Sequence, residues 1–502
     1  MGRWLPSLAL AWLTLGAIGC SYPVRNEAIM AVDQPRYEWK TLQQSDLPDT
    51  LVIFTASGGG TRAAALAMSV LSAMDKVKVP ALPLDKTLVD NIDIISSVSG
   101  GSVTAAYFAL KGKHGLPRLE SDFVRRDGIS ALLGAGLNPV GLAALATPSK
   151  ERIDLLVDYL DRQLFAGETF QALIERRKRP LLILNAADMV ESTPFPFTQY
   201  TMDLLCSDLA RMRLSTAVAA SAAFPVALSP VTLKNYSKCD AVPTPGWIRE
   251  SLKTRWDINP PRVVWGRTAE AYASGSKKYI HLLDGGIADN LGVSEPYRLL
   301  TTTEVQPRFM QPIADGHIKK IIFVMVNARS FSPSKLDDSQ ATPGMIDMLL
   351  ASVGSAIDRA TFGTAERIRT LLTAQFRAAA EAAEAAAAKP PQAGEAPDVV
   401  RLRRELLLQQ ARNFRAIAAN AAFIAVDFDA IEDERCRKEF HNIATTWTLP
   451  QEQIDALKAM GEALFAYNRD FGKAMQALGA QPPPGTFATV DRACAMLGRQ
   501  RG

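Results

Sequence analysis

Histidine is scarce in this chain of 502 residues, which holds only four. None of them (His114, His281, His317 and His441) stands in a pattern typical of the histidine of a Ser-His-Asp triad. His281 lies three residues before Asp284 in an apolar run, so a packed strand residue is its simplest interpretation. A nucleophilic serine in this chain would therefore need a base other than histidine.

Long runs of one charge are also lacking. The 56 Lys and Arg residues are nearly balanced by 52 Asp and Glu residues, which leaves a formal net charge of +4, and the two signs are intermixed. No basic run suggests a nucleic-acid partner. Hydrophobic residues make up 48% of the sequence, which is enough for one large domain or two smaller ones, and no internal repeat is evident.

The N-terminal apolar run, from Leu5 to Ile18, is too short to cross a bilayer as a helix of the mature protein. It follows Arg3 and ends in small residues before Cys20, which is the order of a secretory signal. An ordinary cleaved signal and a plain N-terminal anchor are both compatible with this pattern.

The ending Ala17-Ile18-Gly19-Cys20 resembles a bacterial lipobox. The resemblance implies a lipoprotein signal peptide over residues 1–19 and lipidation of Cys20, which would hold the protein on a membrane. Ser21 is not the aspartate that retains lipoproteins at the inner membrane, so we expect a bacterial cell envelope location at the outer membrane. The polar, proline-bearing residues 20–48 are expected to be a tether.

Four further cysteines remain: Cys206, Cys239, Cys436 and Cys494. An even number in an oxidising compartment suggests two disulfides, for which three pairings exist. We favour Cys206 with Cys239 and Cys436 with Cys494, because each pair lies in one neighbourhood of the chain. The alternative is that all four are buried thiols.

Strands alternate with helices along the chain, which predicts an α/β protein with a mainly parallel central sheet. The expected strands are 51–56, 93–99, 180–185, 195–200, 279–283, 319–326 and 422–428. Helices over 345–388 and 398–418 form an inserted pair before the last strand. The proline-bearing stretch 235–277 is interpreted as loop.

The nearly uncharged, leucine-bearing residues 129–146 allow two interpretations. They could form a lid over an apolar acyl-chain site that touches lipid. Glycines and a proline interrupt the stretch, and we favour the interpretation as an ordinary buried helical region.

Three predicted strands end in glycine or polar clusters: Gly58–Arg62, Ser97–Gly101 and Asp284–Gly286. Carboxyl ends of parallel strands meet at one edge of a sheet, where ligands bind. The three clusters therefore predict a single site.

Each cluster suits one part of acyl transfer. Ser99 stands at the apex of a strand-turn-helix pattern that resembles G-x-S-x-G, with Ser97 in the first glycine place. A serine hydroxyl needs a base, for which Asp284 is the candidate. The backbone N–H groups of Gly58, Gly59 and Gly60 could meet the oxyanion. The alternatives are a plain glycine turn and a turn-capping aspartate.

These motifs, in this order, resemble those of the patatin-like phospholipases. That family carries a glycine-rich G-G-G-x-R/K oxyanion loop, a G-x-S-x-G elbow and a D-G-G/A aspartate. Residues 185–188 and 219–225 look similar to further family segments. The resemblance covers residues 51–293, with a C-terminal elaboration over 300–502, inside one domain spanning 49–502.

The resemblance implies a three-layer α/β/α fold and hydrolysis of membrane-lipid acyl esters through an acyl-enzyme, as in a phospholipase or lysophospholipase. It implies Ser99 as nucleophile and Asp284 as base, without metal or cofactor. Gly58, Gly59 and Gly60 would form the oxyanion hole. Arg62 would support that loop or bind a substrate phosphate.

A second function class stays open at this stage. The chain could be an outer-membrane lipoprotein that binds lipid or a partner on a hydrolase fold, with little catalysis. The presence of both Ser99 and Asp284 favours the enzyme. Neither the lipid, nor the acyl position, nor any protein partner follows from the residues.

Overall fold

The central strands are formed by apolar runs that are buried on both faces. The strand Thr50–Ala56 (β1) has every residue buried, and so does Leu181–Asp188 (β3). Such continuous burial is typical of a parallel sheet covered by helices on both sides. The burial explains why these strands carry an unbroken apolar signal in the sequence.

The computed structural model describes residues 24–30, 35–42, 48–81, 86–128, 151–225, 227–237, 242–302, 309–330, 340 and 342–498. The remaining strands are Ile94–Val98 (β2), Pro194–Pro196 (β4), Val231–Lys234 (β5), Tyr279–Asp284 (β6), Lys320–Asn327 (β7) and Ala422–Asp427 (β8). The helices of the N-terminal half are Trp39–Leu42 (α2), Gly60–Asp75 (α3), Gly100–Lys111 (α4), Leu116–Leu119 (α5), Arg152–Leu160 (α8), Phe170–Arg176 (α9), Gln199–Asp203 (α10), Leu214–Ser221 (α11) and Gly246–Leu252 (α12). The later helices are Pro260–Ala273 (α13), Gly286–Asp289 (α14), Ser294–Thr301 (α15), Met310–Ala314 (α16), Met345–Thr370 (α17), Phe376–Ala387 (α18), Pro397–Asn420 (α19), Glu434–His441 (α20), Gln451–Ala466 (α21), Phe471–Leu478 (α22) and Val490–Gly498 (α23).

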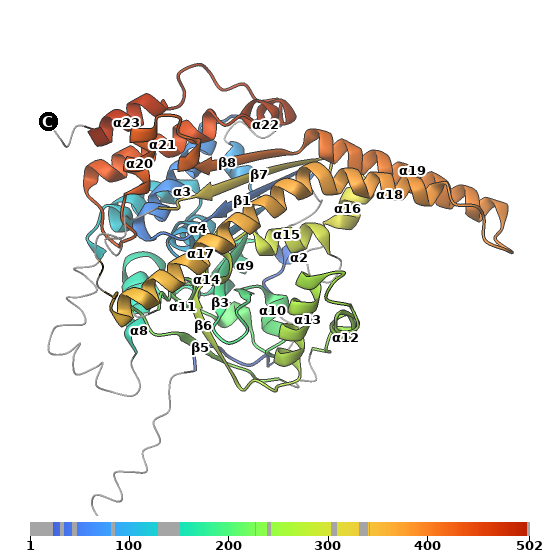
Figure 1. Cartoon of the computed structure of the whole chain (residues 1–502), viewed down its shortest axis with the longest axis horizontal. Helices are drawn as coiled ribbons and strands as arrows, with labels where there is room; N and C mark the ends of the chain where they lie inside the picture. The colour runs from blue at the N-terminus through green and yellow to red at the C-terminus, as the bar shows by residue number, and fades with distance from the viewer. Residues whose placement is uncertain are drawn as a thin grey trace, which may run out of the picture.

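Within the described residues the strands form one eight-stranded sheet in the order β5-β6-β3-β2-β1-β7-β8, with β4 beside β3. The five strands from β3 to β8 are parallel to their neighbours, whereas β6 is antiparallel to β3. Helix α3 packs against both α4 and α21, and all three contact strands; in a second group α15 and α19 contact strands, and α16 packs against both of these helices (Figure 1). The fold is thus the expected three-layer α/β/α arrangement with a mainly parallel sheet.

The direction of β6 corrects one expectation. Asp284 does not follow a strand that is parallel to β2, because β6 enters from beyond the carboxyl edge and runs back toward it. Asp284 pairs with Ala186, one residue after the Asn185 that lies level with Val98. The aspartate therefore reaches the same sheet edge as Ser99 from the opposite direction.

The stretch 235–277 is a second correction, because it contains α12 and α13 instead of a loop throughout. Pro260 is the first residue of α13, where a proline costs no helical hydrogen bond, and Asn259 caps this end by accepting from the Arg262 N–H. The prolines mark helix starts here. The expected strand over 195–200 is likewise shorter and is followed by helix α10.

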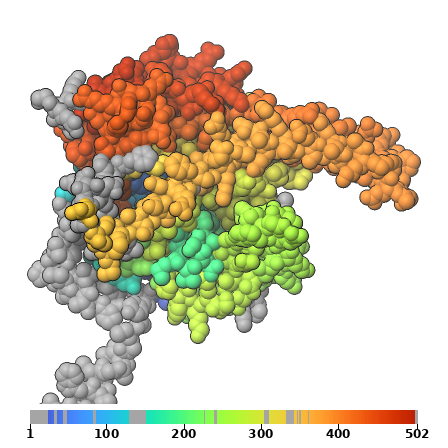
Figure 2. Space-filling view, in the orientation of Figure 1, coloured from blue at the N-terminus to red at the C-terminus, as the bar shows by residue number. Residues whose placement is uncertain are grey.

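The inserted helical pair is confirmed, and it lies between β7 and β8 in the chain. Helix α17 runs on through a π-turn into α18, and α19 returns beside it as a hairpin that projects from the body (Figures 1 and 2). Phe376 and Phe414 stack between the two hairpin helices at a centroid distance of 6.2 Å. Val399, Leu402 and Leu406 on α19 remain largely exposed.

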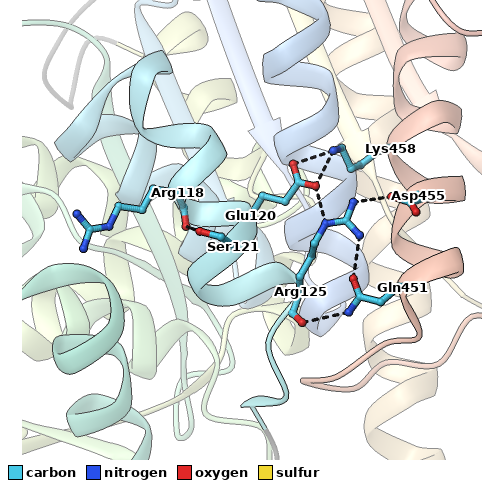
Figure 3. A network of polar contacts seen from close by, with 7 residues as sticks. All are labelled: Arg118, Glu120, Ser121, Arg125, Gln451, Asp455 and Lys458. Carbon is cyan, nitrogen blue, oxygen red and sulfur yellow. Dashed lines mark hydrogen bonds and ion pairs between the residues drawn. The ribbon is translucent and has the colours of Figure 1, made fainter.

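Polar contacts tie the C-terminal helices to the first half of the chain. Glu120 accepts bonds from Lys458 Nζ at 2.6 and 2.7 Å and from Arg125 Nε at 2.7 Å, and Arg125 also bonds Asp455 and Gln451 of α21 (Figure 3). Helix α21 packs on α3, which begins at the glycine loop. The C-terminal segment is therefore part of the frame around that loop.

Cys436 and Cys494 form a disulfide that joins α20 to α23, as the sequence favours. Cys206 is disulfide-bonded as well, whereas Cys239, its expected partner, lies outside the described residues. Cys20 and residues 129–146 also lie outside them. Among the helices of the described part, none is long and apolar enough to cross a membrane.

Candidate functional site

Ser99 occupies a sharp turn between β2 and α4. Its φ of 50° and ψ of −121° lie in a region that a residue with a side chain seldom adopts, and the residue is 7% exposed. Such backbone conformations cluster at functional sites because the surrounding structure must hold them. The turn presents the Ser99 hydroxyl at the carboxyl edge of the sheet.

Close backbone contact explains the two glycines after Ser99. A Cβ atom on Gly100 would lie 2.0 Å from the carbonyl oxygen of Gly60, and one on Gly101 would lie 2.6 Å from that of Ser57. Any side chain at these positions would push the turn away from the glycine loop. The sequence therefore brings the serine turn and the glycine loop into direct contact.

Asp284 faces Ser99 from β6. Its carboxylate lies close enough to Ser99 for that side chain to lower its pKa, and its Oδ1 accepts the Gly286 N–H at 2.8 Å. Burial raises the pKa of Asp284 to about 6, although Gly286 and Ser99 both work to lower it. A buried carboxylate of this kind can titrate near neutral pH and take up a proton from the hydroxyl that it contacts.

The glycine loop offers fewer free donors than the sequence suggests. The Gly58 N–H already donates to the backbone oxygen of Asn290 at 3.1 Å and to its Oδ1 at 3.2 Å. The N–H groups of Gly59 and Gly60 donate to no other described residue, and they lie where α3 begins. Two of the three expected oxyanion donors thus remain available, at a helix terminus that favours negative charge.

Arg62 is 2% exposed and points into the protein. Its Nε donates to the Ala328 oxygen at 2.7 Å, and its two terminal nitrogens donate to the Ile443 oxygen at 2.5 Å and to Thr445 Oγ1 at 2.8 Å. Burial lowers the pKa of Arg62 to about 10. These contacts use all three guanidinium nitrogens to join the start of α3 to the segments around residues 328 and 443–445, and the role of Arg62 toward substrate stays a prediction.

Several residues around the site escape sequence reasoning. Asn290 accepts the hydrogen bond of the Gly58 N–H. The Thr446 oxygen, which lies beside Gly60, accepts the Thr61 N–H at 2.8 Å. Ser221 accepts the Ser99 N–H at 2.9 Å. Ser221 lies in a segment that already resembles the family, which could have signalled it. Thr446 is separated from the loop by hundreds of residues; the stretch 442–450 resembles a segment of bacterial family members, but that resemblance does not indicate a contact with the loop.

Other polar candidates do not join the site. His281 Nδ1 contacts Thr232 Oγ1 at 2.9 Å across two strands, which agrees with a packed strand residue. No cluster of His, Cys, Asp and Glu side chains within the described residues is arranged to hold a metal ion.

The fold and this site define a class: an α/β protein with a strained serine turn, a glycine loop and a buried aspartate at one sheet edge. Residues 55–297 match the family model described as patatin-like phospholipase. Residues 55–297 of this chain therefore form a patatin-like phospholipase domain.

No curated protein sequence matches this chain. Two solved structures of human GIVD cytosolic phospholipase A2 are similar to it. The one in complex with methyl gamma-linolenyl fluorophosphonate has 13% identity and a TM-score of 0.35 over 92% of this chain and 63% of its own. The other has 12% identity and a TM-score of 0.38 over 96% of this chain and 67% of its own. This chain thus spans less than two thirds of the first.

Proposed function

We propose that this protein cleaves fatty-acyl esters of membrane lipids through a Ser99–Asp284 dyad. The observation that carries the proposal is the meeting of the strained Ser99 turn, the glycine loop and the buried Asp284 carboxylate, whose pKa Ser99 lowers, inside a patatin-like phospholipase domain. The pair needs no histidine, which agrees with the short supply of that residue.

In the first half of the reaction, Ser99 Oγ attacks the ester carbonyl carbon while its proton passes to Asp284. The negative charge that develops on the carbonyl oxygen is met by the Gly59 and Gly60 N–H groups. When the tetrahedral intermediate collapses, the carbon–oxygen bond to the alcohol breaks and Asp284 returns the proton to the leaving lysolipid. The acyl group is then esterified to Ser99.

In the second half, water replaces the alcohol. Asp284 takes a proton from the water as it attacks the acyl-enzyme, and the same N–H groups meet the second oxyanion. Collapse breaks the bond to Ser99 Oγ, which regains the proton, and the fatty acid leaves.

Attachment of the protein to a membrane would bring it to a lipid substrate. The lipobox-like ending at Cys20 supports anchoring of the protein to the outer membrane of a bacterial envelope, where acyl esters are abundant. Labelling with a radioactive fatty acid, compared between wild type and Cys20→Ala, tests the anchor. Incorporation in both proteins would exclude Cys20 as the lipidated residue.

The decisive experiment incubates phospholipid vesicles with wild type, Ser99→Ala and Asp284→Asn, and measures free fatty acid and lysolipid by mass spectrometry. We expect product from wild type and none from Ser99→Ala or Asp284→Asn. Ser121→Ala is the matched control, because its hydroxyl is exposed and bonds the Arg118 carbonyl instead of any residue of the site. Product formation by Ser99→Ala at the wild-type rate would overturn the dyad. A wild type that binds vesicles without product would favour a lipid-binding function.

A further inference from the structure

Ser221, the last residue of α11, is fully buried, and its side chain lies directly behind the Ser99 turn. Its Oγ is 2.9 Å from the Ser99 backbone nitrogen, 2.6 Å from the Asn185 carbonyl oxygen and 3.0 Å from Ser102 Oγ. Ser102 Oγ is in turn 3.1 Å from Ser97 Oγ. The dyad chemistry described above uses none of these hydroxyls.

The direction of every bond in this group follows from the number of protons. A hydroxyl has one proton to donate and two lone pairs that accept. The Asn185 carbonyl can only accept, so the Ser221 proton points to it. Ser221 must then accept from both the Ser99 N–H and the Ser102 hydroxyl, and Ser102 accepts from Ser97.

The backbone of the same segment holds the other half of the dyad. The Ser221 carbonyl accepts the Gly285 N–H at 3.0 Å, and the Ala223 carbonyl accepts the Asp284 N–H at 3.0 Å. The side chain of Ser221 thus fixes the serine turn while its carbonyl fixes the aspartate turn. The aspartate turn packs tightly at this point, because a Cβ on Gly285 would lie 2.2 Å from the Asn185 oxygen.

We propose that Ser221 is the positioning residue that sets the distance and orientation between the Ser99 hydroxyl and the Asp284 carboxylate. The inference rests on the proposed function, and it deepens it by assigning a role to a residue that touches neither substrate nor reacting atoms. The strained backbone of Ser99 is held by the bond that its N–H gives to Ser221. Ser97, which stands where the family has glycine, adds one more hydroxyl to this hydrogen-bonded group because it donates to Ser102.

The test compares Ser221→Ala with Ser215→Ala in turnover of a soluble p-nitrophenyl ester. Ser215 lies on the same helix and is buried, and its hydroxyl has no hydrogen-bond partner among the described residues. We expect kcat of Ser221→Ala to fall about 10- to 100-fold with KM within about twofold, because ground-state binding is untouched. Ser215→Ala should keep both constants.

A second readout separates positioning from general loosening. The Ser99 side chain lowers the pKa of Asp284, and no charged described residue is among the causes of that pKa. When Ser221→Ala misorients the hydroxyl, the acid limb of kcat/KM should therefore move to higher pH, by about half a unit. An unchanged kcat together with an unmoved limb would overturn the proposal.

Two further variants keep the outcomes distinct. If Ser221→Ala does not fold, as judged by circular dichroism, Ser221→Cys retains the volume and a weak acceptor, and we expect about a tenfold loss in kcat; wild-type kcat would overturn the role of Ser221. Ser99→Ala tests the underlying function separately. If Ser99→Ala stays active, the dyad itself fails, whereas an inactive Ser99→Ala beside a fully active Ser221→Ala refutes positioning alone.

Discussion

Two buried aspartates lie at opposite edges of the sheet, and burial raises the pKa of each to about 6. Asp93, just before β2, pairs with the Arg179 guanidinium and accepts the Val52 N–H at 2.7 Å. Asp284, at the end of β6, accepts the Gly286 N–H, and Ser99 is the one described side chain that lowers its pKa.

The difference between the two lies in what faces the charge. The Asp93 carboxylate binds the Arg179 guanidinium and accepts the Val52 N–H, and these contacts hold neighbouring segments of the sheet together. At Asp284 no described cation competes, so the carboxylate's basicity is available to the hydroxyl that it contacts. A raised pKa alone therefore does not distinguish a structural aspartate from a reactive one, whereas the partners do.

The largest expected effect separates the two carboxylates by activity. Asp284→Asn should lower kcat on a soluble ester by about 10³-fold or more, because the amide cannot take the Ser99 proton. Asp93→Asn should leave kcat of the folded protein within about twofold. Steady-state kinetics on both variants measure this. A loss of similar size in Asp93→Asn would remove the distinction.

The next effect concerns stability at the Asp93 edge. Arg179→Met leaves the Asp93 carboxylate buried without its cation, and we expect a loss of about 2–4 kcal/mol in the free energy of unfolding at pH 8. We expect a smaller loss in the free energy of unfolding than for a fully buried ion pair, because the Arg179 side chain is 29% exposed. Urea unfolding at pH 8 and pH 5 measures it.

The same variant has a pH signature. Without the cation, the pKa of Asp93 rises further, so a proton on Asp93 removes most of the penalty at pH 5 and the loss should shrink there. Arg179→Lys, which keeps a cation, is the control and should lose less at pH 8. Equal losses at both pH values in Arg179→Met would show that packing, and not charge, sets the cost.

Much of this comparison was within reach of the sequence, and part of it was not. The buried runs of β1, β2, β3 and β7 carry strong local signals, and the glycine and serine turns follow from short motifs. No local pattern in the sequence indicates that β6 is antiparallel to β3, because strand direction is set by pairing with distant residues. The sequence also could not show that the Gly58 N–H is already hydrogen-bonded, because its acceptor, Asn290, lies 232 residues away.

Arg62 illustrates the limit most clearly. A charged residue next to a glycine loop suggests an anionic ligand, but its partners Ile443 and Thr445 lie about 380 residues along the chain. Only the packing of α21 on α3 brings that segment to the loop. Residue type and spacing could therefore predict where the site lies, but not which of its donors are already used by the protein.

The two aspartates should also differ in what neutralisation does to stability. Asp284→Asn removes a carboxylate that burial holds in an unfavourable charged state at neutral pH. The gap between the ordinary value of 3.8 and about 6 corresponds to at most about 3 kcal/mol. Because the folded-state pKa is raised, this contribution favours the fold below pH 3.8 and is lost as pH rises through 6.

We therefore expect Asp284→Asn to be inactive yet more stable than wild type at pH 7, and equal to it near pH 3.8. Asp93→Asn should show no comparable gain, since it deprives Arg179 of its partner. Thermal unfolding at both pH values checks this. A destabilised Asp284→Asn at pH 7 would show that the carboxylate holds the fold together, like that of Asp93.

The smallest expected effect is the pH dependence of the wild type. Asp284 must be ionised to accept the Ser99 proton, so kcat/KM on a soluble ester should rise with pH along a limb centred near 6. Between pH 5 and pH 7 this amounts to about tenfold. The limb should persist in Asp93→Asn, which assigns it to Asp284 although both carboxyls have similar pKa values. A limb that disappears in Asp93→Asn would mean that activity follows the charge at the far edge of the sheet, and the two aspartates would then not be separable by their partners.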